Sequence, residues 1–383
     1  MSDKYIYMDC NSTTPVDEEV LEYMKPYFTE KFGNASSKHH RYGMEALAVV
    51  EHERKSVASL IGAEPSEIIW TSGATESINL ALKGAAEANY KDNSNIVVSE
   101  IEHPAVLDTC TALSKAGIEI RFIKTDEFGI VKIDELEKQI DTNTLLVSVM
   151  TANNEIGTIQ PVAEIGKICR EKNVLFHSDA TQAYGKIPLN VKEMNIDLMS
   201  FSAHKLYGPK GAGALYIKNK NPRINITPQN DGGGHERGLR SGTLNVPAIA
   251  GFGKCAEIAG KRIYGDFNTQ TVLRDRLIEN ILRKISLTRL NGHRTKRLPN
   301  NLNICFEGVD AGTLISELKN IAVSTGSACS SATLQPSHVL KAIGMQNEEV
   351  KSSVRFGIGR MTTDEEVDYT VYKLIHTVNK LRK

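Results

Sequence analysis

The sequence lacks the features that mark membrane-spanning and nucleic-acid-binding chains. No run of eighteen apolar residues occurs in its 383 residues, so we expect no membrane span. Lys and Arg together number 46, as do Asp and Glu, so the formal net charge is zero. A nucleic-acid-binding domain usually carries a basic excess. We therefore expect neither a membrane nor a nucleic acid as partner, and we interpret the basic cluster at 293–297 as a solvated loop.

The cysteines are not clustered, and the N-terminus lacks the apolar core of a signal peptide. Six cysteines stand at positions 10, 110, 169, 255, 305 and 329, with no C-x-x-C pair. Such spacing argues against a disulfide framework and against a zinc site, so we expect no metal. A reducing cytoplasm fits this usage best.

Short β-branched runs alternate with longer helical patterns over most of the chain, which predicts an α/β fold with a mostly parallel sheet. After about residue 251 helical segments dominate, ending in an amphipathic helix at 364–381. We expect a large domain at 15–255 and a smaller α+β domain formed by 1–14 and 256–383. The predicted strands are 67–71, 95–99, 118–124, 145–150, 174–177, 198–201, 214–217 and 302–306, and the predicted helices include 74–90 and 161–172.

In an open parallel sheet, ligands bind beyond the carboxyl ends of the strands, so the residues after each predicted strand are the first candidates for a site. The stretch TSGATES at 71–77 leads from a strand into a helix, where free N–H groups suit a phosphate. An ordinary helix cap with Ser72 at the N-cap is the alternative. His103 stands before Pro104, where an imidazole could stack on a planar ligand or move protons; a surface histidine is the alternative.

Three further strand ends carry polar residues. Asn153 and Asn154 could bind a carboxylate or a phenolic oxygen, or form an Asx turn. Asp179 ends a buried strand and therefore needs a cationic partner, such as a protonated ring nitrogen. Lys205 follows another buried strand and could form a Schiff base with an aldehyde; Lys210 is the alternative nucleophile. A phosphate site, a stacking imidazole, an acid and a lysine together indicate pyridoxal 5′-phosphate (PLP).

Motifs along nearly the whole chain resemble those of cysteine desulfurases of the NifS/IscS kind. These belong to the class V aminotransferases among the fold-type I, aspartate-aminotransferase-like PLP enzymes, which have a large α/β domain and a smaller α+β domain. The motifs are DCNSTTP (9–15), FGNAS (32–36), TSGATES (71–77), EH (102–103), NNEIG (153–157), HSDATQ (177–182), SAHK (202–205), GGGHER (232–237), RSGT (240–243), SAC (327–329) and RFGIGR (355–360).

The resemblance implies a role for each matching residue. Lys205 would bind the PLP aldehyde, Asp179 would pair with the ring nitrogen, and His103 would stack on the ring and assist proton transfer. The remaining cofactor contacts would come from Gln182 at the ring hydroxyl and from a phosphate site of Ala74, Thr75, Ser202 and His204, joined by Thr243 of the other protomer in a homodimer. The substrate-binding residues would be Asn11, Asn154 and Arg355.

The implied reaction converts L-cysteine to L-alanine and leaves the sulfur on Cys329 as a persulfide. Cys329 would then pass the sulfur to an acceptor, such as an iron–sulfur scaffold protein. It stands in TGSACSSAT (325–333), whose small residues offer few packing anchors, so we expect a mobile loop around 324–334.

Three other interpretations share some of these residues. A selenocysteine lyase would keep the lysine, aspartate and histidine, and an aminotransferase would need no thiol. A catalytically inactive partner or scaffold with the same fold would not need Lys205 and Asp179. The sequence also departs from many relatives, which have Ala in place of Ser12 and Gly in place of Ala203.

Overall fold

The computed structural model describes residues 5–219, 224–326 and 336–383. Within these ranges the largest sheet has seven strands in the order β2-β8-β7-β6-β5-β3-β4. Strands β7, β6, β5, β3 and β4 run parallel, whereas β8 is antiparallel to both of its neighbours. The strands are β2 (Ile68–Thr71), β3 (Asn95–Ser99), β4 (Glu119–Ile123), β5 (Thr144–Ser148), β6 (Leu175–Asp179), β7 (Leu198–Ser202) and β8 (Gly213–Ile217).

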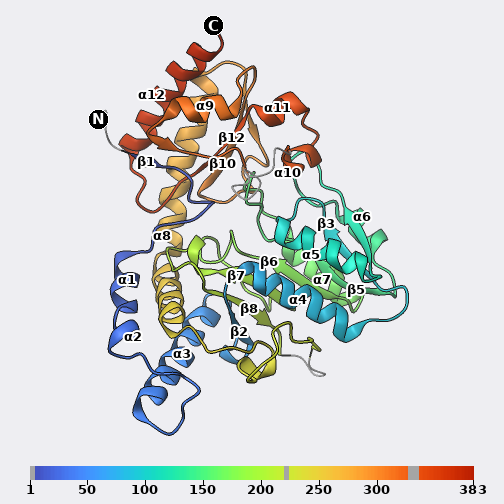
Figure 1. The fold of residues 1–383 in the computed structure, drawn as a ribbon. Helices are drawn as coiled ribbons and strands as arrows, with labels where there is room; N and C mark the ends of the chain where they lie inside the picture. Colours follow the sequence, from blue (N-terminus) through green and yellow to red (C-terminus); the bar gives the residue numbers. More distant parts are fainter. Residues whose placement is uncertain (1–4, 220–223, 327–335) are drawn as a thin grey trace.

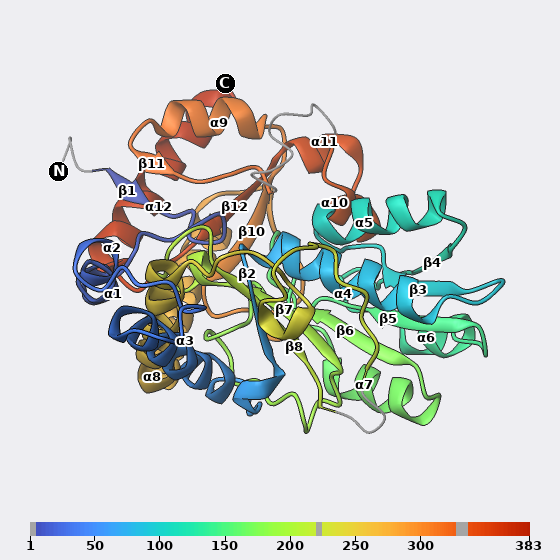
Figure 2. The same ribbon diagram turned by 60° about the horizontal axis from the view of Figure 1, so that its bottom comes forward.

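Both faces of this sheet are buried, which explains why its central strands are apolar without interruption. Alternate residues point to opposite faces. In β3, Val97 packs into one core, while Ile96 and Val98 pack into another. Helices α4 (Ala74–Asn89) and α5 (Pro104–Lys115) cover the second face, as Figure 2 shows. The first face is covered by α3 (Arg41–Ser59), α6 (Ile133–Gln139), α7 (Val162–Glu171) and part of α8 (Val246–Lys284), and α1 (Glu18–Met24) and α2 (Pro26–Thr29) pack against α8.

A separate core lies around a three-stranded antiparallel sheet in the order β12-β10-β9 (Figure 1). The long helix α8 connects the cores: Phe252 packs into the large one and Leu277 into the smaller one. The domain boundary expected between residues 255 and 256 thus lies inside α8. The elements of this part are β1 (Ile6–Tyr7), β9 (Thr288–Asn291), β10 (Asn301–Phe306), β11 (Ile321–Ala322), β12 (Ser353–Gly357), α9 (Ala311–Leu318), α10 (His338–Ala342), α11 (Asn347–Lys351) and α12 (Asp364–Leu381).

Two local expectations are wrong. Gly73, not Ser72, is the N-cap of α4, and it caps the helix without a side chain. The cluster at 293–297 is not wholly solvated, because Arg297 is 1% exposed. Its Nη2 donates to the carbonyls of Ile156 and Asn291, each at 2.7 Å. Main-chain acceptors therefore stabilise a charge that sequence composition places at the surface.

Candidate active site

A cavity of about 480 Å³ opens beyond the carboxyl ends of the parallel strands. Strands far apart in the sequence deliver side chains to it because their carboxyl ends share one edge of the sheet. The predicted residues that line it are Asn11, Ala74, Thr75, His103, Asn154, Asp179, Gln182, Ser202, His204, Lys205 and Arg355.

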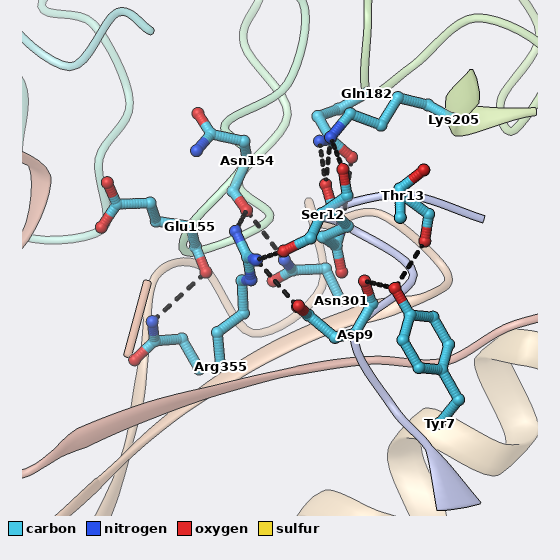
Figure 3. A network of polar contacts seen from close by, with 12 residues as sticks. Tyr7, Asp9, Ser12, Thr13, Asn154, Glu155, Gln182, Lys205, Asn301 and Arg355 are labelled. Carbon is cyan, nitrogen blue, oxygen red and sulfur yellow. Dashed lines mark hydrogen bonds and ion pairs between the residues drawn. The ribbon is translucent and has the colours of Figure 1, made fainter. Parts of the chain in front are cut away.

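Lys205 enters the cavity from the 3-10 turn Ala203–Lys205, directly after β7. Its Nζ donates to the main-chain carbonyl of Asn11 at 2.7 Å and to that of Ser12 (Figure 3). These carbonyls hold the amine in the cavity without neutralising it. The alternative lysine, Lys210, also lines the cavity but is exposed.

Asp179 is the last residue of β6, and His103 follows β3, which is separated from β6 by β5 alone. Asp179 is 5% exposed, and its Oδ1 accepts from the Thr181 N–H at 2.9 Å. No ion pair forms with Asp179 in the described part of the chain, so this buried carboxylate is available to a cationic ligand. His103 is the N-cap of α5: its Nδ1 accepts from the Ala105 N–H at 3.1 Å, which leaves the proton of the neutral ring on Nε2. Burial lowers the pKa of His103 and favours that neutral form.

The part of the cavity next to the N-terminus of α4 can accept an anion. A Cβ on Gly73, the N-cap of this helix, would meet no atom within 4 Å. Gly213 on β8 packs so closely behind it that a Cβ there would lie 2.4 Å from the Gly73 Cα. His204 also faces this cavity, and its Nδ1 lies 3.1 Å from the Thr13 hydroxyl. Burial, with nearby lysines, lowers the pKa of His204 to about 4, so the ring is a neutral donor.

Arg355 on β12 lies at the side of the cavity nearest the smaller core and is 1% exposed. Its Nη2 donates to Asp9 Oδ1 at 2.9 Å and to Ser12 Oγ at 2.7 Å, and its Nη1 donates to the Asn154 carbonyl at 3.0 Å (Figure 3). Its Nε is buried and has no partner among the described residues. Arg355 is thus fixed in place and retains a donor for a further acceptor, such as a carboxylate.

The two adjacent amides take different roles. Asn153 Oδ1 accepts from the N–H groups of Glu155 and Ile156, so the Asx turn holds for this residue. Asn154 lines the cavity instead. Asn11 also lines it and is paired with Gln182: its Nδ2 donates to Gln182 Oε1 at 3.1 Å, and its carbonyl accepts from Gln182 Nε2 at 2.9 Å.

Sequence reasoning missed several polar and charged neighbours of the site. Asp9 and Ser12 hold Arg355, and both stand in the motif at 9–15, which offered a signal. Lys186 donates to Gln182 Oε1 at 3.2 Å, and burial lowers its pKa to about 7. Glu102 precedes His103; burial raises the pKa of Glu102 to about 8, although Oε1 accepts from Ser99 Oγ and from the Met150 N–H.

Besides Asn153, Thr243 is the one predicted site residue in the described part of the chain that does not line the cavity, and it is exposed. Cys329 lies outside the described residues, as does most of the expected loop at 324–334.

Comparison with known proteins decides the family. A model of the aminotransferase class-V family matches residues 6–370. The chain belongs to this family. Among its relatives, a cysteine desulfurase IscS of Rickettsia prowazekii (strain Madrid E) is 51% identical over 378 residues, covering 99% of this chain and 92% of the relative. A second IscS, of Rickettsia typhi (strain ATCC VR-144 / Wilmington), has the same identity and coverage.

Comparison with solved structures agrees with this family assignment. A NifS-like protein superposes with a TM-score of 0.92 at 40% identity, covering 98% of this chain and 100% of that chain. A structure described as SspA in complex with cysteine has a TM-score of 0.83 at 35% identity, covering 92% of this chain and 98% of the other. The fold of this chain is therefore that of the NifS-like enzymes, and within its family the chain belongs to the cysteine desulfurases.

The donor set of the class-V cavity fits PLP. PLP needs an anion site, an acid near its ring nitrogen and a lysine near its aldehyde. Open space at Gly73 beside a helix N-terminus, the buried carboxylate of Asp179, which forms no ion pair with the described residues, and the Lys205 amine meet these three needs. Neither a metal-ligand cluster of three His, Cys, Asp or Glu side chains nor a helix able to cross a membrane occurs within residues 5–219, 224–326 and 336–383.

Proposed function

We propose that this chain uses PLP to convert L-cysteine to L-alanine and to place the released sulfur on Cys329 as a persulfide. The observation that carries the proposal is the gathering of Lys205, Asp179 and Arg355 around one cavity. These are a nucleophilic amine, a buried carboxylate without an ion pair among the described residues, and a cation suited to an amino acid carboxylate.

The residues that would hold PLP lie at two ends of the cavity. The α4 N-terminus with Ala74 and Thr75, together with Ser202 and His204, would take the phosphate. The ring would lie against His103, with Asp179 at its nitrogen and Gln182 at its hydroxyl. When bound, PLP supplies an electron-withdrawing ring that makes the substrate Cα proton removable.

The chain's own groups would then orient the substrate and move its protons. Arg355 and Asn154 would bind the substrate carboxylate, because both line the cavity and the guanidinium Nε has no hydrogen-bond partner among the described residues. The Lys205 amine would take the Cα proton, since it is held in the cavity by main-chain carbonyls. The neutral imidazole of His103, with its proton on Nε2, would assist these proton transfers.

Sulfur transfer requires a thiolate from the chain. The Cys329 thiolate would attack the substrate sulfur, so that the substrate C–S bond breaks as an S–S bond forms. The electron pair of the C–S bond would stay with the carbon skeleton, which takes up a proton and becomes alanine. Neither an external oxidant nor a reductant is needed at this step.

The assembly and the context of the enzyme are also part of the proposal. The exposed position of Thr243 supports a homodimer in which this residue reaches the phosphate of the other protomer. The large domain would be residues 15–255, and residues 1–14 and 256–383 would form the small one; the separate cores support this division. A protein acceptor, such as an iron–sulfur scaffold, would take the persulfide sulfur. The described cysteines, all free, fit a reducing cytoplasm.

A substrate comparison with the purified, PLP-loaded protein tests the proposed reaction. L-cysteine, L-selenocysteine, and L-alanine with a 2-oxo acid are each supplied, and alanine, sulfide and selenide are measured. We expect equimolar alanine and sulfide from L-cysteine in the presence of a thiol. Activity on selenocysteine alone would indicate a lyase for that amino acid, and amino transfer without sulfide would indicate an aminotransferase; either result would contradict the proposal.

A further inference from the structure

Glu155 is a buried carboxylate that none of these roles uses. It follows Asn154 in the turn after β5 and is 1% exposed. Its N–H donates to Asn153 Oδ1 at 2.8 Å, and its carbonyl accepts from Asn303 Nδ2 on β10 at 3.3 Å. Burying a carboxyl costs free energy unless it is hydrogen-bonded, and burial raises the pKa of Glu155. The contacts of its side chain should therefore explain its presence.

One oxygen of Glu155 meets two points of the chain that flank Cys329 in the sequence. Ser337 Oγ donates to Glu155 Oε2 at 2.6 Å and accepts from the Leu340 N–H at 3.1 Å, as the N-cap of α10. Gly326 packs against the same oxygen, because a Cβ there would lie 2.7 Å from Glu155 Oε2. Its φ of +128° also favours glycine. A single carboxyl oxygen therefore contacts both flanks.

Further contacts attach the same flanks to residues of the cavity wall. Ser324 and Arg355 exchange two main-chain hydrogen bonds, at 2.7 Å and 3.2 Å. His338 Nε2 lies 2.9 Å from the carbonyl of Glu102, the residue before His103. The stretch before Cys329 is thus paired with the arginine proposed to bind the substrate carboxylate. The stretch after it is attached next to the proposed ring-stacking histidine.

We propose that Glu155 is a positioning residue for sulfur transfer: it accepts a hydrogen bond from Ser337, lies close to Gly326, and so holds these two flanks of Cys329 in place relative to Arg355. This inference rests on the proposed function. Asn154 and Glu155 are consecutive, so the turn after β5 serves both the substrate carboxylate and the Cys329 segment. Reaction between two groups depends steeply on their relative placement, so loosening this attachment should slow the S–S bond-forming step.

The test separates sulfur transfer from the earlier steps on the PLP-loaded protein. Each variant is mixed rapidly with L-cysteine, and the absorbance change of the bound cofactor reports substrate binding and proton removal. Quenched samples are analysed by mass spectrometry for sulfur added to the peptide that contains Cys329. We expect Glu155→Ala and Ser337→Ala to slow sulfur addition about tenfold or more, as expected for losing a buried hydrogen-bond partner. The cofactor absorbance change should keep its wild-type rate.

Conservative and matched variants distinguish positioning from general stability. Glu155→Gln keeps an acceptor for Ser337, and Ser337→Thr keeps the hydroxyl, so both should stay within about threefold of wild type. Asp310→Ala removes the N-cap of another helix, α9, remote in the sequence from the Glu155 contacts, and should not slow sulfur addition. If Glu155→Ala fails to fold, the pair Ser337→Ala and Ser337→Thr decides.

Three outcomes separate this inference from the proposed function. Wild-type sulfur-addition rates in Glu155→Ala and Ser337→Ala would overturn the inference, as would an equal slowing of the cofactor absorbance change. No sulfur on Cys329 in the wild-type protein would instead overturn the proposed function.

Discussion

Arg355 donates from Nη1 to the main-chain carbonyl of Asn154 at 3.0 Å, although the two residues are 201 positions apart in the sequence. This bond joins β12 of the smaller core to the turn after β5 of the large sheet. Asp9 and Ser12, from the N-terminal segment, accept from Nη2 of the same guanidinium. Three separate parts of the chain thus fix the group proposed to bind the substrate carboxylate.

Replacing Arg355 with lysine should weaken L-cysteine binding. Lysine keeps the charge but cannot contact Asp9, Ser12 and Asn154 with one planar group while leaving a further donor free. We expect KM to rise about tenfold to a hundredfold, because charge-assisted hydrogen bonds contribute about 1.5–3 kcal/mol. Steady-state alanine assays measure this. Arg289→Lys, in an exposed ion pair with Glu349, is the matched control, and an unchanged KM for Arg355→Lys would contradict the assignment.

Replacing Lys205 with alanine should abolish covalent cofactor attachment. The purified variant should lose the visible absorption band of the bound cofactor, and kcat should fall about 10²–10⁴-fold or more because the proposed base is removed. Absorption spectra and alanine assays with added PLP measure both effects. Lys210→Ala is the control because Lys210 lines the same cavity but is exposed. Loss of the band in Lys210→Ala, with its retention in Lys205→Ala, would reverse the assignment.

Glu102 should make stability depend on pH. Its pKa rises from 4.5 to about 8 through burial, so the stability that its protonated form contributes is fully present below about pH 4.5. That contribution falls as pH rises through about 8. Glu102→Gln mimics the protonated form and does not titrate. Its free energy of unfolding, relative to that of the wild type, should therefore increase as the pH rises from about 4.5 to about 8.

Urea denaturation of the PLP-loaded proteins at several pH values measures this difference. Glu137→Gln, at an exposed glutamate of α6, is the control and should show no such gain. A constant difference between Glu102→Gln and wild type over the whole range would show that the Glu102 carboxyl titrates in its ordinary range.

Replacing Thr243 with alanine tests the proposed homodimer. Thr243 is exposed and does not line the cavity of its own chain, so it can affect the cofactor only from another protomer. We expect about tenfold weaker PLP binding, in line with losing one hydrogen bond to a charged group. Fluorescence titration of the cofactor-free protein measures this, with Thr111→Ala, on the exposed side of α5, as control. Unchanged PLP affinity, or an active monomer by sedimentation, would refute the role.

The sequence predicted most of the cavity because strand ends are local features with a shared location. Runs such as 174–177 are readable as buried strands, and parallel strands bring their carboxyl ends together. The order of strands along the chain therefore suffices to place Asp179 and Lys205 near each other. The chemistry of the strand-end residues indicated PLP, and the remaining cofactor and substrate roles came from motif resemblance.

Contacts between remote segments could not be predicted in this way. No local pattern indicates that Ser12 accepts a hydrogen bond from Arg355, or that Glu155 meets Ser337. The continuous helix α8 passes from one core to the other, whereas composition indicated a boundary within it. Arg297 is buried because main-chain carbonyls accept its hydrogen bonds, which composition cannot show.

The central claim is that Cys329 receives the sulfur of L-cysteine. The most direct measurement is mass spectrometry of the PLP-loaded protein after one turnover with L-cysteine and no added thiol, with alanine measured in the same sample. We predict one added sulfur atom on the Cys329 peptide for each alanine formed, and no added sulfur in Cys329→Ser, which should still bind PLP. Alanine formed with no sulfur on Cys329, or sulfide released at the wild-type rate by Cys329→Ser, would contradict the account.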